Sequence, residues 1–253
     1  MQREHLGLLA DVARAFTARR IVAIGAAALR WHYTTFRGTL DLDLCIAIDL
    51  DEHSRADALP TEWRRKRGMP HRWHLPDGQL LDIVPAADDL LAAGVVNWPD
   101  GTAMDLCGID LAMRDNQRYA DELPAEVRVA SRRALFVTKV AAWLDRPHDR
   151  HKDLGDIARL CDEYVDDADP RRFDEPALEG RDWDERPTFL LGMDLAAVCS
   201  ARHGSRIREF AARIGDPARL EHVWMLGAAP TAWQADPTAV SRRMQALLDG
   251  FGH

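Results

Sequence analysis

The stretch Ile21–Ile48, IVAIGAAALRWHYTTFRGTLDLDLCIAI, decides the fold of this chain. It begins with an apolar run, Ile21–Ile24, which predicts a short buried strand. Gly25 breaks that strand, and the following residues predict a helix that ends at about Tyr33. The stretch closes with Asp41–Ile48, where polar and apolar residues alternate as they do in a half-buried strand. The sequence therefore predicts a strand, a glycine turn, a helix and a second strand.

The second strand presents two different faces. Successive side chains of a strand point to opposite sides, so Asp41 and Asp43 share one face. The opposite face carries only apolar residues, which can enter a core: Leu42, Leu44, Ile46 and Ile48. Carboxylates at positions i and i+2 lie roughly 6–7 Å apart, and both can reach a cation such as Mg²⁺, which prefers oxygen ligands. A lone Asp-x-Asp is also typical of a solvated strand end, so the metal interpretation depends on the surrounding pattern.

A third carboxylate, Asp82, lies inside a later apolar run, LLDIVP. This run is the second arm of a predicted hairpin, in which His71–Leu75 and Gln79–Val84 flank the turn Pro76-Asp77-Gly78. An aspartate in such a strand is costly to bury unless it is paired or bound to a cation. Asp82 is therefore either a functional carboxylate or the partner of an arginine. We favour the functional carboxylate because Asp41 and Asp43 precede it.

Composition limits the classes of protein that remain. The chain has 253 residues, of which 47% are hydrophobic and 29% charged, so it can bury a substantial core. A net charge of −8 and a pI of about 5.7 argue against a broad basic surface for duplex nucleic acid. Its four cysteines are far apart in the sequence and are interpreted as buried thiols. The chain has neither a signal peptide nor an apolar run of about 18 residues, so we expect a cytoplasmic protein without membrane contact.

The sequence offers both backbone amide groups and basic side chains that could bind an anion. Gly25 can expose the amide groups at the start of the helix to a phosphate, or it can simply meet the φ requirement of a tight turn. Arg37 precedes the aspartate strand and could contact a phosphate or be a solvated loop residue. The most basic segment is a candidate for binding a polyanion, although charge runs usually mark solvated faces; its members are Arg64, Arg65, Lys66, Arg67 and Arg72.

The second half of the chain is predicted to be helical. Two more strands of the sheet are expected around Met104–Met113. A helix over Arg132–Leu144 carries Lys139 at the border of its apolar stripe, where the lysine either extends to solvent or meets a triphosphate. A second helix, His151–Cys161, turns Asp153 inward, and an acidic, proline-rich linker is expected over Asp166–Trp183. Later helices are expected over Thr188–Ala201, Ser205–Ile214, Pro217–Leu226 and Pro237–Phe251.

Together these motifs resemble a known superfamily. Gly25, then Arg37-x-Thr39-x-Asp41-x-Asp43, and later Leu81-Asp82-Ile83 look like the nucleotidyltransferase superfamily that includes DNA polymerase β. They are most similar to its AbiEii-type toxin branch. Lys139 and the segment Lys152-Asp153-Leu154-x-Asp156 are similar to the helical region that follows the catalytic domain in that branch. The resemblance implies an α/β nucleotidyltransferase fold with a mixed sheet flanked by helices over residues 1–125 and an all-helical domain over 126–253.

The resemblance also implies an activity. A nucleoside monophosphate would pass from an NTP to an acceptor hydroxyl, with release of pyrophosphate and with Mg²⁺, or alternatively Mn²⁺, as cofactor. Asp41, Asp43 and Asp82 would hold the metal, and Lys139 would take part in catalysis. Nucleotide binding is implied for Gly25, Ala26, Arg37, Thr39 and Lys139, with Asp153 or Asp156 completing the site or orienting Lys139. The acceptor would contact the basic segment of Arg64, Arg65, Lys66, Arg67 and Arg72.

Three interpretations of the function remain open. An RNA or tRNA end as acceptor would make the protein a toxin, with an antitoxin protein as partner. A small cationic acceptor, as in antibiotic nucleotidyltransferases, would suit the negative net charge. The third interpretation is a catalytically silent nucleotide-binding protein, because Ala26 stands where the family usually has Ser or Gly and Asp41 follows it by 15 positions.

Overall fold

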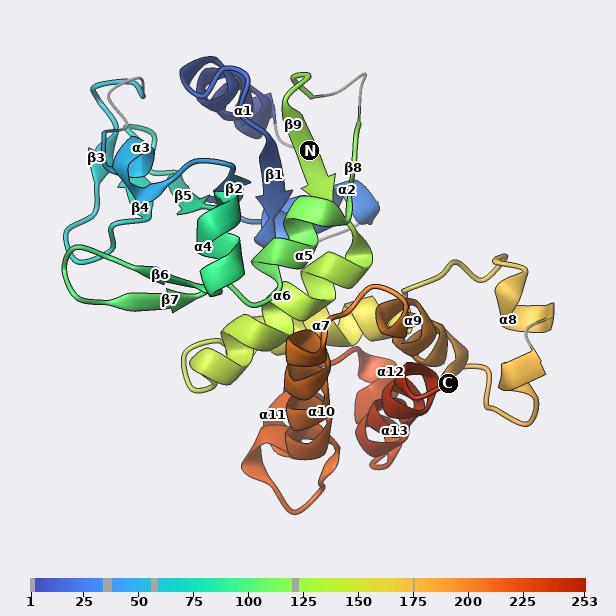
Figure 1. Ribbon diagram of the computed structural model, residues 1–253. Coiled ribbons are helices and arrows are strands. Elements are labelled where there is room, and N and C mark those ends of the chain that lie inside the picture. Colours follow the sequence, from blue (N-terminus) through green and yellow to red (C-terminus); the bar gives the residue numbers. More distant parts are fainter. Residues whose placement is uncertain (1–2, 34–37, 56–58, 120–122, 175) are drawn as a thin grey trace. The chain divides into compact units, whose positions relative to one another are not determined.

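The computed structural model describes residues 3–33, 38–55, 59–119, 123–174 and 176–253 (Figure 1). The chain divides into two compact units, Met1–Thr138 and Lys139–His253. The first unit combines a sheet with helices, and the second is built from helices. This is the mixed α/β architecture with a helical C-terminal part that the sequence predicts.

A mixed seven-stranded sheet organises the first unit, in the order β3-β4-β5-β2-β1-β9-β8 (Figure 1). β2 lies parallel to β5 and β1 lies parallel to β9, whereas the other neighbours are antiparallel. The strands are β1 (Ile21–Ile24), β2 (Asp41–Ile46), β3 (Arg64–Arg65), β4 (Arg72–His74), β5 (Leu80–Pro85), β8 (Asn116–Gln117) and β9 (Val127–Ala130). A separate two-stranded sheet pairs β6 (Val95–Asn97) with β7 (Ala103–Asp105).

The core of this unit lies against the apolar face of β2. Leu42, Leu44 and Ile46 are completely buried, as are Leu81 and Ile83 on the neighbouring β5. Burying each of these side chains stabilises the fold by about 1.5–3 kcal/mol relative to leaving it in water. The predicted alternation of β2 is confirmed, and the burial of its apolar face fixes which face carries the aspartates.

Five helices accompany the sheet: α1 (Arg3–Ala15), α2 (Gly25–His32), α3 (Leu50–Ser54), α4 (Asp88–Ala93) and α5 (Ile109–Arg114). α3 begins with a capping box, in which the Asp49 carboxylate accepts from the Glu52 amide and the Glu52 carboxylate accepts from the Asp49 amide. α3 ends at Ser54, and residues 56–58 lie outside the described residues.

The prediction of two further sheet strands around Met104–Met113 is wrong. Only Met104 and Asp105 are extended, and β7, to which they belong, pairs with β6 in the separate sheet. The remainder forms the helix α5, which buries Ile109 and Met113. A short apolar run does not distinguish a strand from a buried helix, because either can be apolar on all sides.

The second unit consists of helices. α6 (Arg132–Asp145) begins in the first unit and ends in the second. The others are α7 (His151–Asp162), α8 (Arg171–Asp174), η1 (Pro176–Leu178), α9 (Arg186–Ala196), α10 (Ala201–Gly215), α11 (Leu220–Ala228), α12 (Thr231–Gln234) and α13 (Ala239–Phe251). The backbones of α9 and α13 lie so close together that a Cβ at Gly250 would overlap the carbonyl oxygen of Phe189.

The segment Asp166–Trp183, expected to be a linker, contains the short helices α8 and η1. Some of its charged residues form local contacts. The Asp169 carboxylate accepts from the Arg171 amide, and the Arg172 guanidinium lies 3.9 Å from the centre of the Trp183 ring. Across the described parts of both units, none of the helices has the length and apolar character needed to cross a membrane.

Candidate functional site

The three predicted metal ligands lie on one face of two neighbouring strands. Asp43 on β2 stands directly opposite Asp82 on β5, and Asp41 stands opposite Leu80. Because side chains two residues apart share a face, all three carboxylates belong to the same side of the sheet. Asp41 and Asp43 are partly exposed, whereas Asp82 is 7% exposed. The register thus gathers carboxylates that lie about forty positions apart in the sequence.

Asp82 is held by an arginine. Arg72 on β4 stands opposite Asp82, and its Nε and Nη2 atoms donate to Oδ1 and Oδ2 at 2.7 and 2.6 Å. The hydrogen bond to Asp82 raises the pKa of Arg72, and the charges of Asp41 and Asp43 add to this effect. Of the two interpretations of Asp82, the structure shows the arginine partner. Each carboxylate oxygen has two lone pairs, so the bidentate contact fixes Asp82 and leaves it acceptor capacity.

Gly25 lies against the Asp43 carboxylate. Its φ is +68°, and a Cβ there would overlap Oδ2 of Asp43 and lie 2.8 Å from Cγ. The residue therefore meets two requirements, the left-handed backbone and the close approach of β1 and α2 to the carboxylate. The turn interpretation and the site interpretation of Gly25 are both consistent with this geometry, because the turn itself carries the backbone to Asp43.

The remaining predicted nucleotide contacts near β2 are only partly described. The Asp41 amide donates to Oγ1 of Thr39 at 3.1 Å, so this threonine holds the start of the aspartate strand. Ala26 is buried near the N-terminus of α2, where no side chain caps the helix. Arg37 lies outside the described residues. Thr39 therefore has a defined structural role beside Asp41.

The donor set suits a hard cation. Three carboxylates share the face: the guanidinium of Arg72 binds Asp82, and Asp41 and Asp43 are partly exposed. Their oxygen atoms are not as closely gathered as in a preformed cation site. Within the described residues, the group whose carboxylate oxygens all lie within 4.8 Å of one another is Asp182, Asp184 and Glu185. Arginines already bind that group, since Arg242 contacts Asp182 and Glu185, and Arg243 contacts Asp184.

The basic segment does not act as a single patch. Arg64 pairs with His74 and therefore points to the aspartate face. Arg65 points to the opposite face, where its guanidinium lies 4.8 Å from the centre of the Trp73 ring and donates to the His53 carbonyl at 2.7 Å. Lys66 and Arg67 follow β3 and line a pocket, and Arg72 is bound to Asp82. Strand alternation and one ion pair thus divide the five predicted acceptor contacts into different environments.

The second unit contains the other predicted group. Nζ of Lys139 on α6 donates to Asp156 at 2.6 Å and to Asp153 at 3.0 Å, both on α7. Arg150 donates to the second oxygen of Asp153 at 2.8 Å. Lys139, Asp153 and Asp156 are each at most 5% exposed. Lys139 therefore does not extend to solvent, and the three residues form a buried ion cluster that joins two helices.

The charges in this cluster stabilise one another. Burial alone would lower the pKa of Lys139, but the charges of Asp153 and Asp156 outweigh it and raise the pKa. Burial would likewise raise the pKa of Asp153, but Lys139 and Arg150 lower it. Lys139 and Asp153 are thus both charged at neutral pH.

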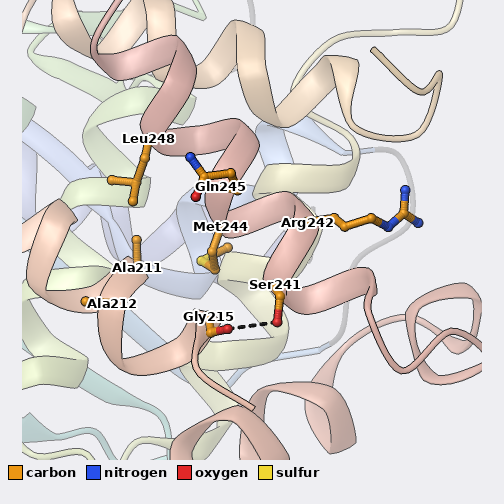
Figure 2. Close-up of a pocket in the computed structure, with 8 residues that line it drawn as sticks. All are labelled: Ala211, Ala212, Gly215, Ser241, Arg242, Met244, Gln245 and Leu248. Carbon is orange, nitrogen blue, oxygen red and sulfur yellow. Dashed lines mark hydrogen bonds between the residues drawn. The ribbon is translucent and has the colours of Figure 1, made fainter. Parts of the chain in front are cut away.

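A further pocket of about 450 Å³ lies in the second unit between α10 and α13 (Figure 2). Its wall is mainly small or apolar, and Figure 2 shows Ser241 donating to the carbonyl of Gly215, at 2.7 Å. Its charged member, Arg242, is bound to Asp182, Glu185 and Asp236. This pocket therefore lacks an unneutralised charge suited to a nucleotide phosphate.

Sequence reasoning missed the environment of His53. This side chain is 2% exposed, packs against Trp73 and Trp98, and contacts the Ile83 carbonyl through Nε2 at 3.1 Å. Burial lowers the pKa of His53 to about 4, and the charge of Arg65 adds to the shift. The sequence contains both tryptophans, but its hydrophobic pattern does not predict that β4, α3 and the β6–β7 turn come together.

Comparison with curated proteins gives no significant match to this chain. Two crystal structures from Helicobacter pylori are similar, each with a TM-score of 0.43, 16% identity and 98% of this chain covered. One is of a protein proposed to be a nucleotidyltransferase, covered over 93% of its length, and the other is of JHP933, covered over 90%. Such low values do not establish a shared fold.

A family profile gives the decisive match. The family described as "Nucleotidyl transferase AbiEii toxin, Type IV TA system" matches residues 102–229, just over half of the chain. The matched region contains the ion cluster of Lys139, Asp153 and Asp156 and begins after the aspartates of β2 and β5. The chain therefore belongs to the AbiEii nucleotidyltransferase toxin family of type IV toxin–antitoxin systems.

Proposed function

We propose that this nucleotidyltransferase transfers a nucleoside monophosphate from an NTP to a hydroxyl of an RNA end, in a reaction that depends on Mg²⁺. The observation that carries the proposal is the alignment of Asp41, Asp43 and Asp82 on one face, with the backbone of Gly25 against Asp43. Carboxylates on adjacent strands are the ligands that a cation bound to a triphosphate requires.

Asp41 and Asp43 would hold the metal because both are partly exposed on the face that they share with Asp82. When bound, the metal would stabilise the negative charge that develops on the transferred phosphoryl group and on the leaving pyrophosphate. Thr39 keeps Asp41 in place through the hydrogen bond from the Asp41 amide. Mn²⁺ could replace Mg²⁺, because both take carboxylate oxygens.

Asp82 and Arg72 would act as a unit on the same face. Arg72 fixes both oxygens of Asp82, and the remaining lone pairs of the carboxylate point away from the guanidinium. In this position Asp82 can accept the proton of the attacking hydroxyl or share the metal. Nucleotide contacts of Gly25, Ala26, Arg37 and Lys139 complete the proposal, together with Asp153 and Asp156 as the groups that orient Lys139.

The acceptor is proposed to be RNA because basic residues lie on the edge strand β3 and directly after it. Arg64 points to the aspartate face, and Lys66 and Arg67 continue from the edge strand β3. Phosphate contacts of this kind position a nucleic-acid strand without reading its sequence. The net charge of −8 favours a cationic small molecule as the second candidate acceptor. An antitoxin is the proposed protein partner, as the type IV family implies.

The decisive experiment measures transfer of label from each α-³²P NTP to total RNA in the presence of Mg²⁺. Wild type is compared with Asp41→Asn and Asp43→Asn, which keep the side-chain volume and remove the charge. Asp51→Asn on the exposed surface of α3 is the matched control. We expect labelled RNA with wild type and the control, and loss of label by at least about a hundredfold in the two site variants.

Absence of labelled RNA with every NTP would overturn the RNA proposal. Transfer to a cationic small molecule that still needs Asp41 and Asp43 would then support the second candidate. Tight NTP binding without transfer to any acceptor would identify a silent nucleotide-binding protein. Transfer that survives in Asp43→Asn would contradict the metal role of the aspartates.

A further inference from the structure

A pocket of about 320 Å³ lies in the first unit beside the basic segment. Its wall comes from α3, from β3 and the following turn, and from the turn between β6 and β7; Figure 1 shows these elements gathered at the β3 edge of the sheet. We call it the edge pocket, and its lining residues include Leu50, Ser54, Lys66, Arg67, Pro70 and Trp98. Its volume is at the lower end of the range for small-ligand sites, about 300–1,000 Å³.

The edge pocket has a cationic rim in an acidic protein. Arg65, Lys66 and Arg67 contribute three positive charges, and Asp100 contributes one negative charge, which leaves an excess of two. His53 is neutral at physiological pH because burial lowers its pKa to about 4. Arg65 is held by Trp73 and the His53 carbonyl, whereas Lys66 and Arg67 form no ion pair within the described residues. These two side chains are therefore available to an anion from outside.

The rest of the pocket is apolar. Leu50, Pro70, Trp98 and Pro99 form its wall, and Trp98 is fixed because its ring packs 5.1 Å from that of His53. Trp98 is 5% exposed, so it contributes only a small area to this wall. An apolar wall beside two cations matches a nucleotide, in which a base or ribose is attached to a phosphate. Inorganic phosphate would use only the rim.

The sheet topology connects this pocket with the aspartates. β3 is the edge strand, and Arg64 points to the face that carries Asp41, Asp43 and Asp82. Arg65 points to the other face, and Lys66 and Arg67 follow at the end of the strand. Cationic side chains thus lead from the aspartate face around the sheet edge. A flexible single strand can follow such a path, whereas a stiff duplex cannot bend around one short strand.

We propose that the edge pocket binds one nucleotide of a single-stranded RNA acceptor, a few nucleotides away from the reacting end, with its phosphate on Lys66 and Arg67. The inference rests on the proposed function for the identity of the acceptor. It adds an anchoring site on the opposite side of the sheet edge from the aspartates. The pocket binds the strand without base-specific readout, because its charged members contact phosphate and its wall is apolar.

The test measures binding of a fluorescein-labelled single-stranded RNA of about 12 nucleotides to the full chain by anisotropy, at several salt concentrations. Lys66→Ala/Arg67→Ala is expected to raise the Kd about tenfold or more. It should also reduce the slope of log K against log salt by about 0.7, since the contact with one phosphate is lost. The control Arg14→Ala/Arg128→Ala removes two exposed charges elsewhere in the same unit and should leave the Kd within about twofold.

A second variant tests the pocket rather than the charge. Ser54→Trp keeps every charge and fills part of the cavity from the exposed end of α3. We expect it to raise the Kd at least about fivefold with an unchanged salt slope. Wild-type affinity in Ser54→Trp would overturn the proposal, as would equal losses in the double variant and its control. Millimolar AMP should not displace the RNA, and displacement by micromolar AMP would overturn the strand site in favour of a free-nucleotide site.

Failure of this inference and failure of the proposed function give different results. Binding is measured without NTP, so it does not depend on transfer. If wild type labels RNA and Lys66→Ala/Arg67→Ala binds normally, the edge pocket is refuted and the nucleotidyl transfer stands. If the double variant loses binding but wild type labels no RNA, the pocket stands and the proposed transfer to RNA fails.

Discussion

At the aspartate face, one side chain fixes the orientation of another. Asp82 is almost completely buried and is bound by both donor atoms of Arg72. Removing one member of such a pair leaves an uncompensated charge, at a cost of about 3–5 kcal/mol. Arg72 therefore determines the stability of the β4–β5 hairpin as well as the orientation of Asp82. A lysine would not be equivalent, because its ammonium lacks the rigid, planar pair of N–H donors that matches both carboxylate oxygens.

Gly25 gives the sharpest prediction at this scale. Gly25→Ala places a Cβ against the Asp43 carboxylate and puts a side chain on a residue with φ of +68°. We expect transfer activity to fall by about a hundredfold, because displacing a positioned group by about 1 Å has that effect. The free energy of unfolding should fall by about 1–3 kcal/mol. Steady-state kinetics and thermal unfolding give the two values.

Gly78→Ala is the matched control, because Gly78 has φ of +83° and a Cβ there would meet no atom within 4 Å. It should lower stability by about 1 kcal/mol through backbone strain and leave activity near wild type. Equal activity losses in the two variants would show that strain, and not the contact with Asp43, makes Gly25 necessary.

His53 predicts a pH dependence of stability. Its pKa is about 4 in the folded protein and 6.5 without perturbation, so the unfolded chain binds more protons between these values. Stability contributed by neutral His53 is therefore complete above pH 6.5 and is lost as the pH falls towards 4, by about 3 kcal/mol in total. His53→Gln retains a donor for the Ile83 carbonyl but cannot titrate. Thermal unfolding across this range should show a smaller loss of Tm in the variant than in wild type, and parallel curves would contradict the assignment.

At the scale of elements, the join between α6 and α7 depends on the ion cluster. Lys139 contributes the positive charge that lies between Asp153 and Asp156, and all three are buried. Such a cluster specifies how two helices pack more than it adds net stability, because desolvation offsets much of the attraction. Strain or loss in the cluster would therefore alter the packing of both helices.

Lys139→Met tests this element. It leaves Asp156 without its lysine and Asp153 with Arg150 alone, so we expect the free energy of unfolding to fall by about 3–5 kcal/mol. Lys139→Met combined with Asp156→Leu should recover part of the loss by removing the unpaired charge. Urea unfolding measures both. A wild-type midpoint in the single variant would show that the cluster does not stabilise the join.

For the whole molecule, cation binding should be coupled to stability. Asp41, Asp43 and Asp82 place three carboxylates on one face only when the sheet is formed, so Mg²⁺ should bind the folded state and not the unfolded chain. At a concentration about 100 times the Kd, the gain is about 2.7 kcal/mol. Thermal unfolding with Mg²⁺ and with EDTA should differ in wild type and not in Asp41→Asn/Asp43→Asn. A gain that persists in the variant would place the cation elsewhere, for example at Asp182 and Asp184.

The sequence by itself determined the features that depend on near neighbours. Alternation along Asp41–Ile46 fixed which face carries the aspartates, and the hairpin around Pro76-Asp77-Gly78 fixed the strand that carries Asp82. The same hairpin, symmetric about Asp77, also implied that Arg72 faces Asp82. Arg72, which its charge predicts to contact the acceptor, is instead paired with Asp82 by this register. Periodicity and turn chemistry are local, so they can be deduced from a few consecutive residues.

Only the tertiary structure decided what depends on distant segments. It paired β1 with β9, turned Arg64 and Arg65 to opposite faces, and assembled the edge pocket from three separate stretches. It also buried Lys139 between Asp153 and Asp156, where a border position on an apolar stripe left the side chain free to extend or to pair. These outcomes follow from competition among many long-range contacts for one core. No local pattern records which of those contacts is most favourable, so the sequence supplied the residues of the site and the fold decided their partners.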